Sequence, residues 1–276
     1  MGKPEYINCN LCAADDTELV RSAEHPFKVV RCKACGLIYV NPQPHIDAIL
    51  GSYRADYYSE WIAKQTKSRQ RLWKSRLAQL KKYKHSGSLL DVGCGDGIFL
   101  TLARDGGWEV CGTEISEYAW RYSKEKKGLN VFKGELKEAN FGSRSFDCVT
   151  LWHTLEHTRD PLGTLTEISR ILKDDGILIV EVPNVNNYLF RAVYRLVKRK
   201  PLSLFSLRDK EWHLFHFPEK NLKLLLEKAN FQVVARTLKI SQVLMPQRLL
   251  EMICSVIFWI SRINIGSTFR LYARKA

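Results

Sequence analysis

The feature that most constrains the fold of this chain is the alternation of apolar runs with amphipathic stretches from Ser88 onward. Short apolar runs predict buried strands, and apolar residues at three- and four-residue spacing predict helices. We expect strands in SLLDVG, WEVCGTE, LNVFKGE, FDCVTLW, GILIVEV, FQVVARTL and TFRLYARK, and helices in GIFLTLARDG, SEYAWRYSKEKKG, PLGTLTEISRILKDDG and PEKNLKLLLEKAN. This alternation predicts an α/β fold with a parallel, doubly wound sheet and helices on both faces.

Two further regions precede this α/β region, and two insertions interrupt it. Residues 1–43 carry cysteines and end near the prolines of NPQP, which break regular structure. Residues 44–86 form a predicted helical linker or cap, because SEWIAKQTKSRQRLWKSRLAQLKKYKH contains helical spacings of apolar residues among many charges. Residues 87–276 make up the α/β domain, with insertions near residues 186–211 and 243–265 that we expect to form helical lids.

A glycine-rich turn lies directly after the first predicted strand of this domain. LLDVGCGDG places Asp91, Gly93, Gly95 and Gly97 between a strand and a helix. Glycines there permit a tight turn and a close backbone approach to a ligand, and the helix N-terminus offers free N–H groups. Glu114 ends the next predicted strand, 21 residues after Gly93, where a carboxylate can accept hydrogen bonds from both ribose hydroxyls of a nucleoside.

Together with the segments that follow, this turn resembles the class I S-adenosylmethionine-dependent methyltransferases, of the type seen in sugar and quinone methylases. LLDVGCGDG is similar to their first motif, and GTEIS is similar to their acidic second motif. GELKEANFGSRSFDCVTLWHTLEH resembles their third strand and fourth motif, and EISRILKDDGILIVEVPN resembles the helix, turn and strand that follow. The resemblance covers roughly residues 88–240, with FRLYARK as the expected final antiparallel strand, and it implies a Rossmann-like methyltransferase sheet.

The resemblance also implies a binding site for the cofactor S-adenosyl-L-methionine. A nicotinamide dehydrogenase is the structural rival, but its G-x-G-x-x-G pattern is not present in the turn. The implied cofactor-binding residues are Asp91, Gly93, Gly95 and Gly97 around the methionine moiety, Glu114 and Ile115 at the ribose, Glu135 and Leu136 at the adenine, and Trp152 and His153 close to the sulfonium.

The segment LWHTLEH contains His153-x-x-Glu156-His157, the pattern of the zinc site in inverted zinc metalloproteases. That site needs both histidines on one helical face, whereas His153 follows a predicted buried strand and Asp160-Pro161 begins the next helix. The context argues against a protease and places His153 at a strand's carboxyl end, where doubly wound folds bind ligands. Both histidines are candidate catalytic bases, since the pKa of free histidine is about 6.5. The alternative is that Glu156 and His157 only cap the following helix.

A second group of histidines lies in EWHLFHFPEKNL, between the first insertion and a predicted helix. In the resembling family this segment folds back over the active site. His213 and His216 are therefore candidate catalytic or substrate-contacting residues. The alternative is aromatic packing in which the two histidines have no chemical role.

Two C-x-x-C pairs, Cys9 with Cys12 and Cys32 with Cys35, are separated by 19 residues. Two thiolate pairs at such spacing can close a tetrahedral site on Zn²⁺ with no open position, which predicts a structural zinc ribbon. A redox role is the alternative, but neither pair lies on a thioredoxin-like turn from strand to helix. Similar ribbons precede methyltransferase domains in bacterial sugar-modifying enzymes and in some ribosomal RNA methylases.

The net charge of +14 favours an anionic partner, although a basic surface alone would also produce it. In the first insertion, YLFRAVYRLVKRK places Arg191, Arg195, Lys198 and Arg199 on one helical face, a pattern suited to an anionic membrane or a phosphate-bearing substrate. In the second, the apolar run LLEMICSVIFWIS is too short to span a bilayer. We therefore expect no transmembrane segment, a cytoplasmic location, and peripheral membrane contact at most.

These observations predict a methyltransferase that transfers a methyl group from S-adenosyl-L-methionine to a small polar acceptor. A sugar or a lipid- or nucleotide-linked glycan precursor, methylated on oxygen, is the favoured acceptor by resemblance. RNA is the alternative acceptor, because of the basic charge and the ribbon. A non-catalytic S-adenosylmethionine-binding scaffold is a further alternative, which the intact glycine turn and Glu114 argue against.

Overall fold

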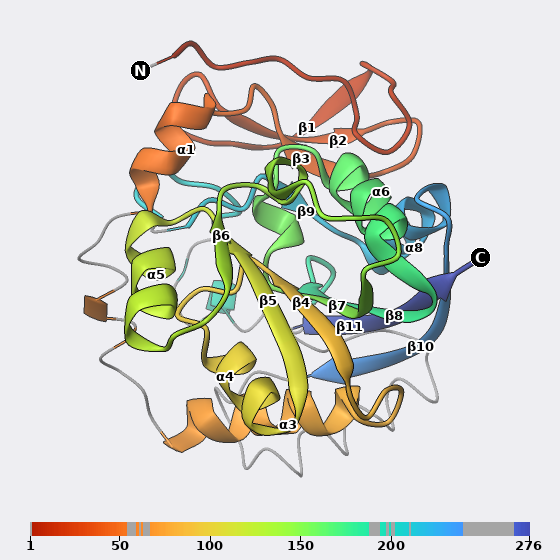
Figure 1. Cartoon of the computed structure of the whole chain (residues 1–276). Coiled ribbons are helices and arrows are strands. Elements are labelled where there is room, and N and C mark those ends of the chain that lie inside the picture. The colour runs from red at the N-terminus through yellow and green to blue at the C-terminus, as the bar shows by residue number, and fades with distance from the viewer. Residues whose placement is uncertain are drawn as a thin grey trace.

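The computed structural model describes residues 2–53, 59–60, 62, 67–187, 194–196, 199, 202–209, 211–239 and 268–276. A seven-stranded sheet forms the centre of the molecule, and a four-stranded sheet lies at one end (Figure 1). The order of the large sheet is β10-β11-β8-β7-β4-β5-β6. The predicted α/β fold is confirmed.

The strands of the large sheet are β4 (Gly87–Val92), β5 (Trp108–Glu114), β6 (Val131–Lys133), β7 (Phe146–Trp152), β8 (Leu172–Pro183), β10 (Phe231–Lys239) and β11 (Thr268–Lys275). The helices are α1 (Ile46–Ser52), α3 (Lys67–Leu80), α4 (Ile98–Asp105), α5 (Glu117–Arg121), α6 (Pro161–Ile171) and α8 (Glu219–Lys228). Shorter turns are the π-helix η1 (Tyr122–Lys126) and the 3₁₀ helices η2 (Leu136–Ala139) and η3 (Leu155–His157).

The order of the five central strands explains where a ligand can bind. Strands β6, β5, β4, β7 and β8 run parallel, whereas β11 pairs antiparallel with β8, and β10 pairs antiparallel with β11. The chain order reverses between β4 and β7, so the loops after these strands diverge and leave a crevice at their carboxyl ends. The two loops are the glycine turn after Val92 and the histidine segment after Trp152.

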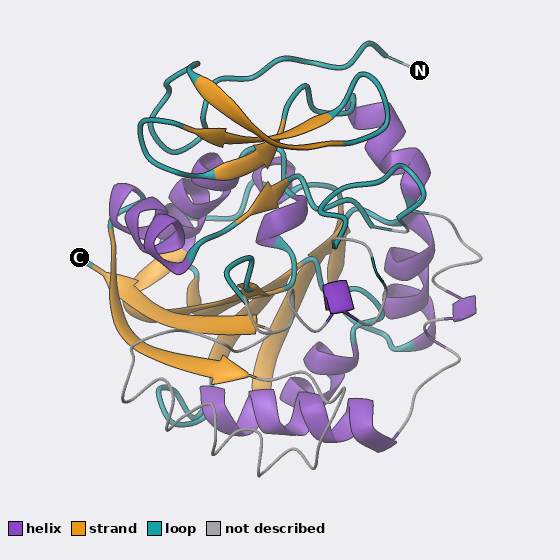
Figure 2. Ribbon diagram, turned by 180° about the vertical axis from the view of Figure 1, so that it is seen from behind, coloured by secondary structure: helices purple, strands orange, loops and turns teal. Residues whose placement is uncertain are grey.

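Helices cover both faces of the large sheet (Figure 2). Side chains alternate between the faces along each strand: Leu89 of β4 belongs to a core shared with α3 and α4, whereas Leu90 belongs to a second core shared with α6 and α8. The second core continues into the cysteine-bearing region and includes Leu11 and Tyr39. The N-terminal region and the α6–α8 layer therefore share one continuous apolar interior.

The small sheet combines three strands of the N-terminal region with one strand from much later in the sequence. It contains β1 (Thr17–Ser22), β2 (Lys28–Cys32), β3 (Ile38–Val40) and β9 (Phe215–His216), in that order. Ile38 pairs with His216 and Tyr39 with Phe215, and the Val40 N–H donates to the Leu214 carbonyl at 2.9 Å. The sheet of the cysteine-bearing region thus extends beyond residue 43 into the α/β region (Figure 1).

Several local details differ from the sequence prediction. The helix predicted over SEYAWRYSKEKKG divides into α5 and the π-helix η1, and α6 ends at Ile171 instead of continuing through KDDG. Lys173–Gly176 lie within β8, where the register against β7 is irregular. The second insertion, 243–265, and most of the basic helix predicted over residues 188–200 lie outside the described residues. No helix among the described residues is long and apolar enough to cross a membrane.

Candidate active site

The glycine turn is held against the end of β5 by its own backbone. The N–H groups of Gly93 and Cys94 both donate to the Thr113 carbonyl, at 2.9 and 3.0 Å. Gly93 adopts a φ of 71°, a left-handed conformation that favours glycine. A Cβ atom there would lie 2.6 Å from Cγ2 of Thr154, in the histidine segment. The turn therefore needs glycine both for its conformation and for its approach to Thr154.

Glu114 ends β5 beneath this turn and is 4% exposed. Its Oε2 accepts from the Gly95 N–H at 2.8 Å, and its Oε1 accepts from the Ser116 N–H at 2.7 Å. Burial raises the pKa of Glu114 to about 7, although the backbone hydrogen bonds from Ser116 and Gly95 lower it in part. The carboxylate is thus oriented by two fixed donors, and its remaining lone pairs are available to a ligand.

Two cavities of about 470 and 410 Å³ meet at Glu114, and we call them together the Glu114 cleft. Tyr53, Gly93, Ile115, Thr154 and His157 also line both. The first cavity is further lined by Ile46, Ile49, Leu50, Val92, Thr113, Lys133, Gly134, Glu135, Leu136, Lys137, Glu138, Thr158, Arg159, Asp160 and Thr164. The second is further lined by Arg69, Leu72, Trp73, Arg76, Cys94, Gly95, Trp152, His153 and Glu211.

Most residues that the sequence indicated for the cofactor are brought together at this cleft. Two of them, Asp91 and Gly97, are not among its described lining residues. Asp91 is buried and accepts from the Thr150 hydroxyl at 2.6 Å, and burial raises its pKa to about 7. A Cβ atom at Gly97 would lie 2.4 Å from Cδ1 of Leu129, so this glycine serves the packing of α4. Asp91 and Gly97 thus contact residues outside the cleft and stabilise the elements on either side of the glycine turn.

His153 has an unusual backbone and a charged environment. Its φ of 57° is left-handed, which is uncommon for a residue other than glycine and occurs often at functional sites. Its Nδ1 lies 3.3 Å from Oε1 of Glu156, and its Nε2 lies 3.3 Å from Oε1 of Glu181. Burial alone would lower the pKa of His153, but the two carboxylates outweigh it and raise the pKa to about 9. The ring is therefore an imidazolium at neutral pH.

Sequence reasoning missed the buried ionic group that holds His153. Glu181 of β8 pairs with Arg76 of α3, and its Oε2 accepts from Nε of Arg270 of β11 at 2.7 Å. All three side chains are at most 4% exposed, and both guanidinium groups lie over the Trp152 ring, at 4.7 and 4.8 Å from its centre. No local motif marks Arg76, Glu181 or Arg270, because they come from three elements far apart in the sequence.

The remaining candidate histidines gather beside a third cavity, which we call the His213 cavity. It has a volume of about 260 Å³. The rings of His157 and His213 meet edge to face with centres 4.7 Å apart, and His213 and His216 lie 6.1 Å apart. The lining residues are Glu156, Pro183, Asn184, Val185, Asn187, Leu202, Ser203, Leu204, His213, Phe215, His216 and Phe217. Glu156 and His213 line this cavity, whereas their neighbours His153 and His157 line the Glu114 cleft.

Comparison with known proteins decides the family. A family described as "Methyltransferase domain" matches residues 65–236. The chain belongs to this family. The methyltransferase is 29% identical over 182 residues to a demethylmenaquinone methyltransferase of Staphylococcus haemolyticus, across 59% of this chain and 76% of that protein. It is 30% identical over 179 residues to the Staphylococcus aureus (strain MRSA252) protein of the same name, across 58% of this chain and 74% of that protein.

Solved structures of low sequence identity share the fold. Magnesium protoporphyrin IX methyltransferase from Synechocystis PCC 6803, solved with bound SAH, aligns with a TM-score of 0.60 at 13% identity, across 84% of this chain and 100% of that chain. A SAM-dependent methyltransferase from Archaeoglobus fulgidus aligns with a TM-score of 0.52 at 23% identity, across 75% of this chain and 94% of that chain. The chain is thus a class I methyltransferase, an enzyme that takes its methyl group from S-adenosylmethionine.

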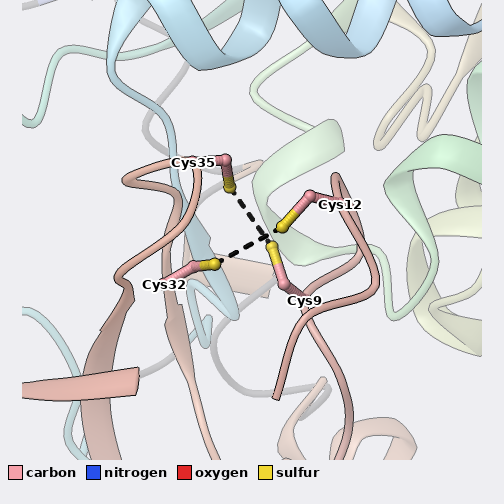
Figure 3. A group of neighbouring side chains, drawn as sticks. All are labelled: Cys9, Cys12, Cys32 and Cys35. Atoms are coloured by element: carbon pink, nitrogen blue, oxygen red, sulfur yellow. Dashed lines mark hydrogen bonds between the residues drawn. The ribbon is translucent and has the colours of Figure 1, made fainter. Parts of the chain in front are cut away.

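Four of the cysteines form a compact cluster: Cys9, Cys12, Cys32 and Cys35 (Figure 3). Sγ of Cys9 lies 3.5 Å from Sγ of Cys35, and Sγ of Cys12 lies 3.4 Å from Sγ of Cys32. All four sulfurs lie within 4.8 Å of one another, and four thiolates around Zn²⁺ at about 2.3 Å would be about 3.8 Å apart. The cluster therefore fits a tetrahedral metal.

The two C-x-x-C turns have matching backbone geometry. Ala13 N–H donates to the Cys9 carbonyl at 2.8 Å, and Gly36 N–H donates to the Cys32 carbonyl at the same distance. Ala13 and Gly36, each directly after a pair, both have positive φ values, 62° and 82°. This symmetry directs both thiol pairs to one centre.

We expect Gly93→Ala to weaken the binding of S-adenosylmethionine at least about tenfold, because the added Cβ displaces Thr154 or the turn. Calorimetric titration measures the dissociation constant. Gly128→Ala is the matched control, since Gly128 is also left-handed (φ 60°) but has open space around its Cβ position. Equal dissociation constants for the two variants would contradict the assigned role of Gly93.

Proposed function

We propose that the chain methylates a small polar acceptor on oxygen, a sugar or a lipid- or nucleotide-linked glycan precursor. One observation carries the proposal: the segment His153–His157 contributes lining residues to both the Glu114 cleft and the His213 cavity. A methyl donor in the first and an acceptor in the second would approach each other beside this segment. In-line displacement needs such positioning above all.

The Glu114 cleft fits S-adenosylmethionine in its chemistry. Glu114 would accept hydrogen bonds from the ribose hydroxyls, with Ile115 beside it. Glu135 and Leu136 would contact the adenine, with Leu136 buried and Glu135 exposed. Gly93 and Gly95 would lie against the methionine moiety, with Trp152 and His153 near the sulfonium.

The His213 cavity fits an acceptor that carries hydroxyl groups. Asn184 and Asn187 are 8% and 7% exposed and offer amide groups at one side of the cavity. Phe215 and Phe217 are buried with nearly parallel rings, 6.0 Å between centres, and can pack against the apolar face of a sugar ring. A cavity that combines a few polar groups with aromatic walls is typical of small-molecule sites.

Removal of the acceptor proton would fall to a histidine beside the His213 cavity. His153 is protonated at neutral pH, so we assign it an electrostatic and positioning role between Glu156 and Glu181. Burial and the neighbouring His157 lower the pKa of His213 to about 4, so this ring is neutral at pH 7. His213 and His157 are the candidate bases, and His216 contributes to the wall of the cavity.

A second acceptor class is a quinone-like ring. The Staphylococcus relatives are named for demethylmenaquinone, and Val185, Leu202 and Leu204 add apolar surface to the His213 cavity. RNA is a third candidate, supported by the net charge of +14.

We also propose that Cys9, Cys12, Cys32 and Cys35 bind one structural Zn²⁺. The support is the fit of the four sulfurs to a tetrahedral ion and the absence of an open ligand position in a four-thiolate site.

The affinity for S-adenosylmethionine should depend on the charge of Glu114. The pKa of this group is about 7, so the fraction that is ionised falls as the pH drops from 8 to 6. Because ribose hydroxyls donate to the ionised form, binding should weaken several-fold over this range. Calorimetry at both pH values measures it. Glu114→Gln should bind weakly and lose most of the pH dependence; an unchanged slope in this variant would contradict the role of Glu114.

The acceptor is identified by transfer of a labelled methyl group. Full-length protein and labelled S-adenosylmethionine are incubated in parallel with nucleotide sugars, lipid-linked glycans, demethylmenaquinone in detergent, and total RNA. We expect incorporation into a sugar-containing fraction, lost in Glu114→Ala. Incorporation into quinone or RNA only would replace the glycan proposal, and binding of S-adenosylmethionine without transfer to any fraction would favour a scaffold.

Cobalt substitution tests whether the cysteine cluster binds a metal ion. Thiolate-to-cobalt charge-transfer bands should appear in the parent and in Cys111→Ser, whose cysteine is outside the cluster. Cys32→Ser should lose these bands and unfold at lower temperature, because a structural metal contributes folding free energy. Charge-transfer bands that survive in Cys32→Ser would contradict the four-cysteine site.

A further inference from the structure

A second group of metal-binding side chains lies at the junction of the Glu114 cleft and the His213 cavity. A carboxylate oxygen of Glu156, a ring nitrogen of His157 and a ring nitrogen of His213 all lie within 4.8 Å of one another. Glu156 and His157 belong to η3, and His213 precedes β9. The Leu214 N–H donates to the Glu156 carbonyl at 2.8 Å, so a backbone hydrogen bond fixes the two segments together.

Glu156 is a buried carboxylate, and the ring of His153 is its nearest described charged neighbour. It is 1% exposed, and neither of its oxygens receives a well-directed hydrogen bond from a described residue. Nδ1 of His153, 3.3 Å from Oε1, is an ion-pair neighbour of one oxygen only. A buried charge with so few partners is costly, and a metal ion is one of the partners that compensates it.

His157 is oriented as a metal ligand is. Its Nδ1 lies 2.9 Å from the Trp212 carbonyl oxygen. A carbonyl only accepts, so Nδ1 donates its proton to this oxygen, and in the neutral ring Nε2 keeps its lone pair. Histidines that bind metals almost always donate their other ring N–H to a carboxylate, a carbonyl or water in this way.

We propose that Glu156, His157 and His213 bind a divalent first-row metal ion, separate from the four-cysteine cluster. Two imidazoles and one carboxylate form a donor set of catalytic Zn²⁺ sites, which keep one position open. Glu156 and His213 line the His213 cavity and His157 lines the Glu114 cleft, so an open position would face the space between donor and acceptor. This inference deepens the proposed function: such an ion would bind an acceptor oxygen and make its proton more acidic, and His157 and His213 would then act as its ligands and not as bases.

Metal content of the full-length protein tests the site without any acceptor. After dialysis against Zn²⁺ and removal of free metal, the parent should hold two equivalents, and His213→Gln and Glu156→Gln should hold one. His216→Gln is the matched control: this neighbouring histidine lines the same cavity but is not in the ligand set, and the variant should keep two. One equivalent in the parent, or loss of the second in His216→Gln, would overturn the proposed ligand set.

The parent also supplies a measurement that depends on no variant. When the cysteine cluster is first filled with Zn²⁺, added Co²⁺ should give d–d bands of a nitrogen- and oxygen-ligated ion without thiolate charge transfer. Failure to bind this second ion would overturn the inference. Methyl transfer is assayed separately: transfer by a one-metal protein leaves the proposed function intact, whereas two bound ions without transfer to any acceptor would refute that function and leave the metal site.

Discussion

The antiparallel pairing of β3 with β9 is the interaction on which the arrangement of the site depends. It joins the cysteine-bearing sheet to the segment that carries His213 and His216. On the other side of the same segment, the Leu214 N–H reaches the Glu156 carbonyl, and Asn221 Nδ2 donates to the Cys35 carbonyl at 2.8 Å. The proposed metal at the cysteine turns would therefore also hold one wall of the His213 cavity.

A second constraint is the balance of buried charge around Trp152. Glu181 is shared by Arg76, Arg270 and His153, which come from α3, β11 and the end of β7. Removing one partner from such a group leaves an uncompensated charge, which is strongly destabilising. The arrangement links α3, β11 and the segment that follows β7. It also keeps His153 protonated beside the proposed sulfonium position, which separates its role from that of the neutral His213.

The large sheet was largely predictable because its signals are local. WEVCGTE, FDCVTLW and TFRLYARK coincide with β5, β7 and β11. The helix predicted through KDDG was wrong at its end, because Leu172 and Ile177, on either side of this turn, both pair with β7, and KDDG forms the irregularity between them inside β8. Within the site, Glu114 and the glycine turn follow from spacing along one strand–turn–helix unit. Arg76, Glu181 and Tyr53 could not be found in this way, since no periodicity or motif marks a side chain whose partner lies on a distant element.

By itself, the sequence determined the α/β class, the glycine turn, the position of Glu114 at the end of a strand and the pairing of cysteines into two turns, because each depends on residues close together in the chain. Only the tertiary structure decided which histidines meet. LWHTLEH and EWHLFHF are more than fifty residues apart, and they come together because β9 adds to the cysteine-bearing sheet at the carboxyl ends of β7 and β8. That long-range pairing brings Glu156, His157 and His213 together, and their spacing in the sequence does not reveal it.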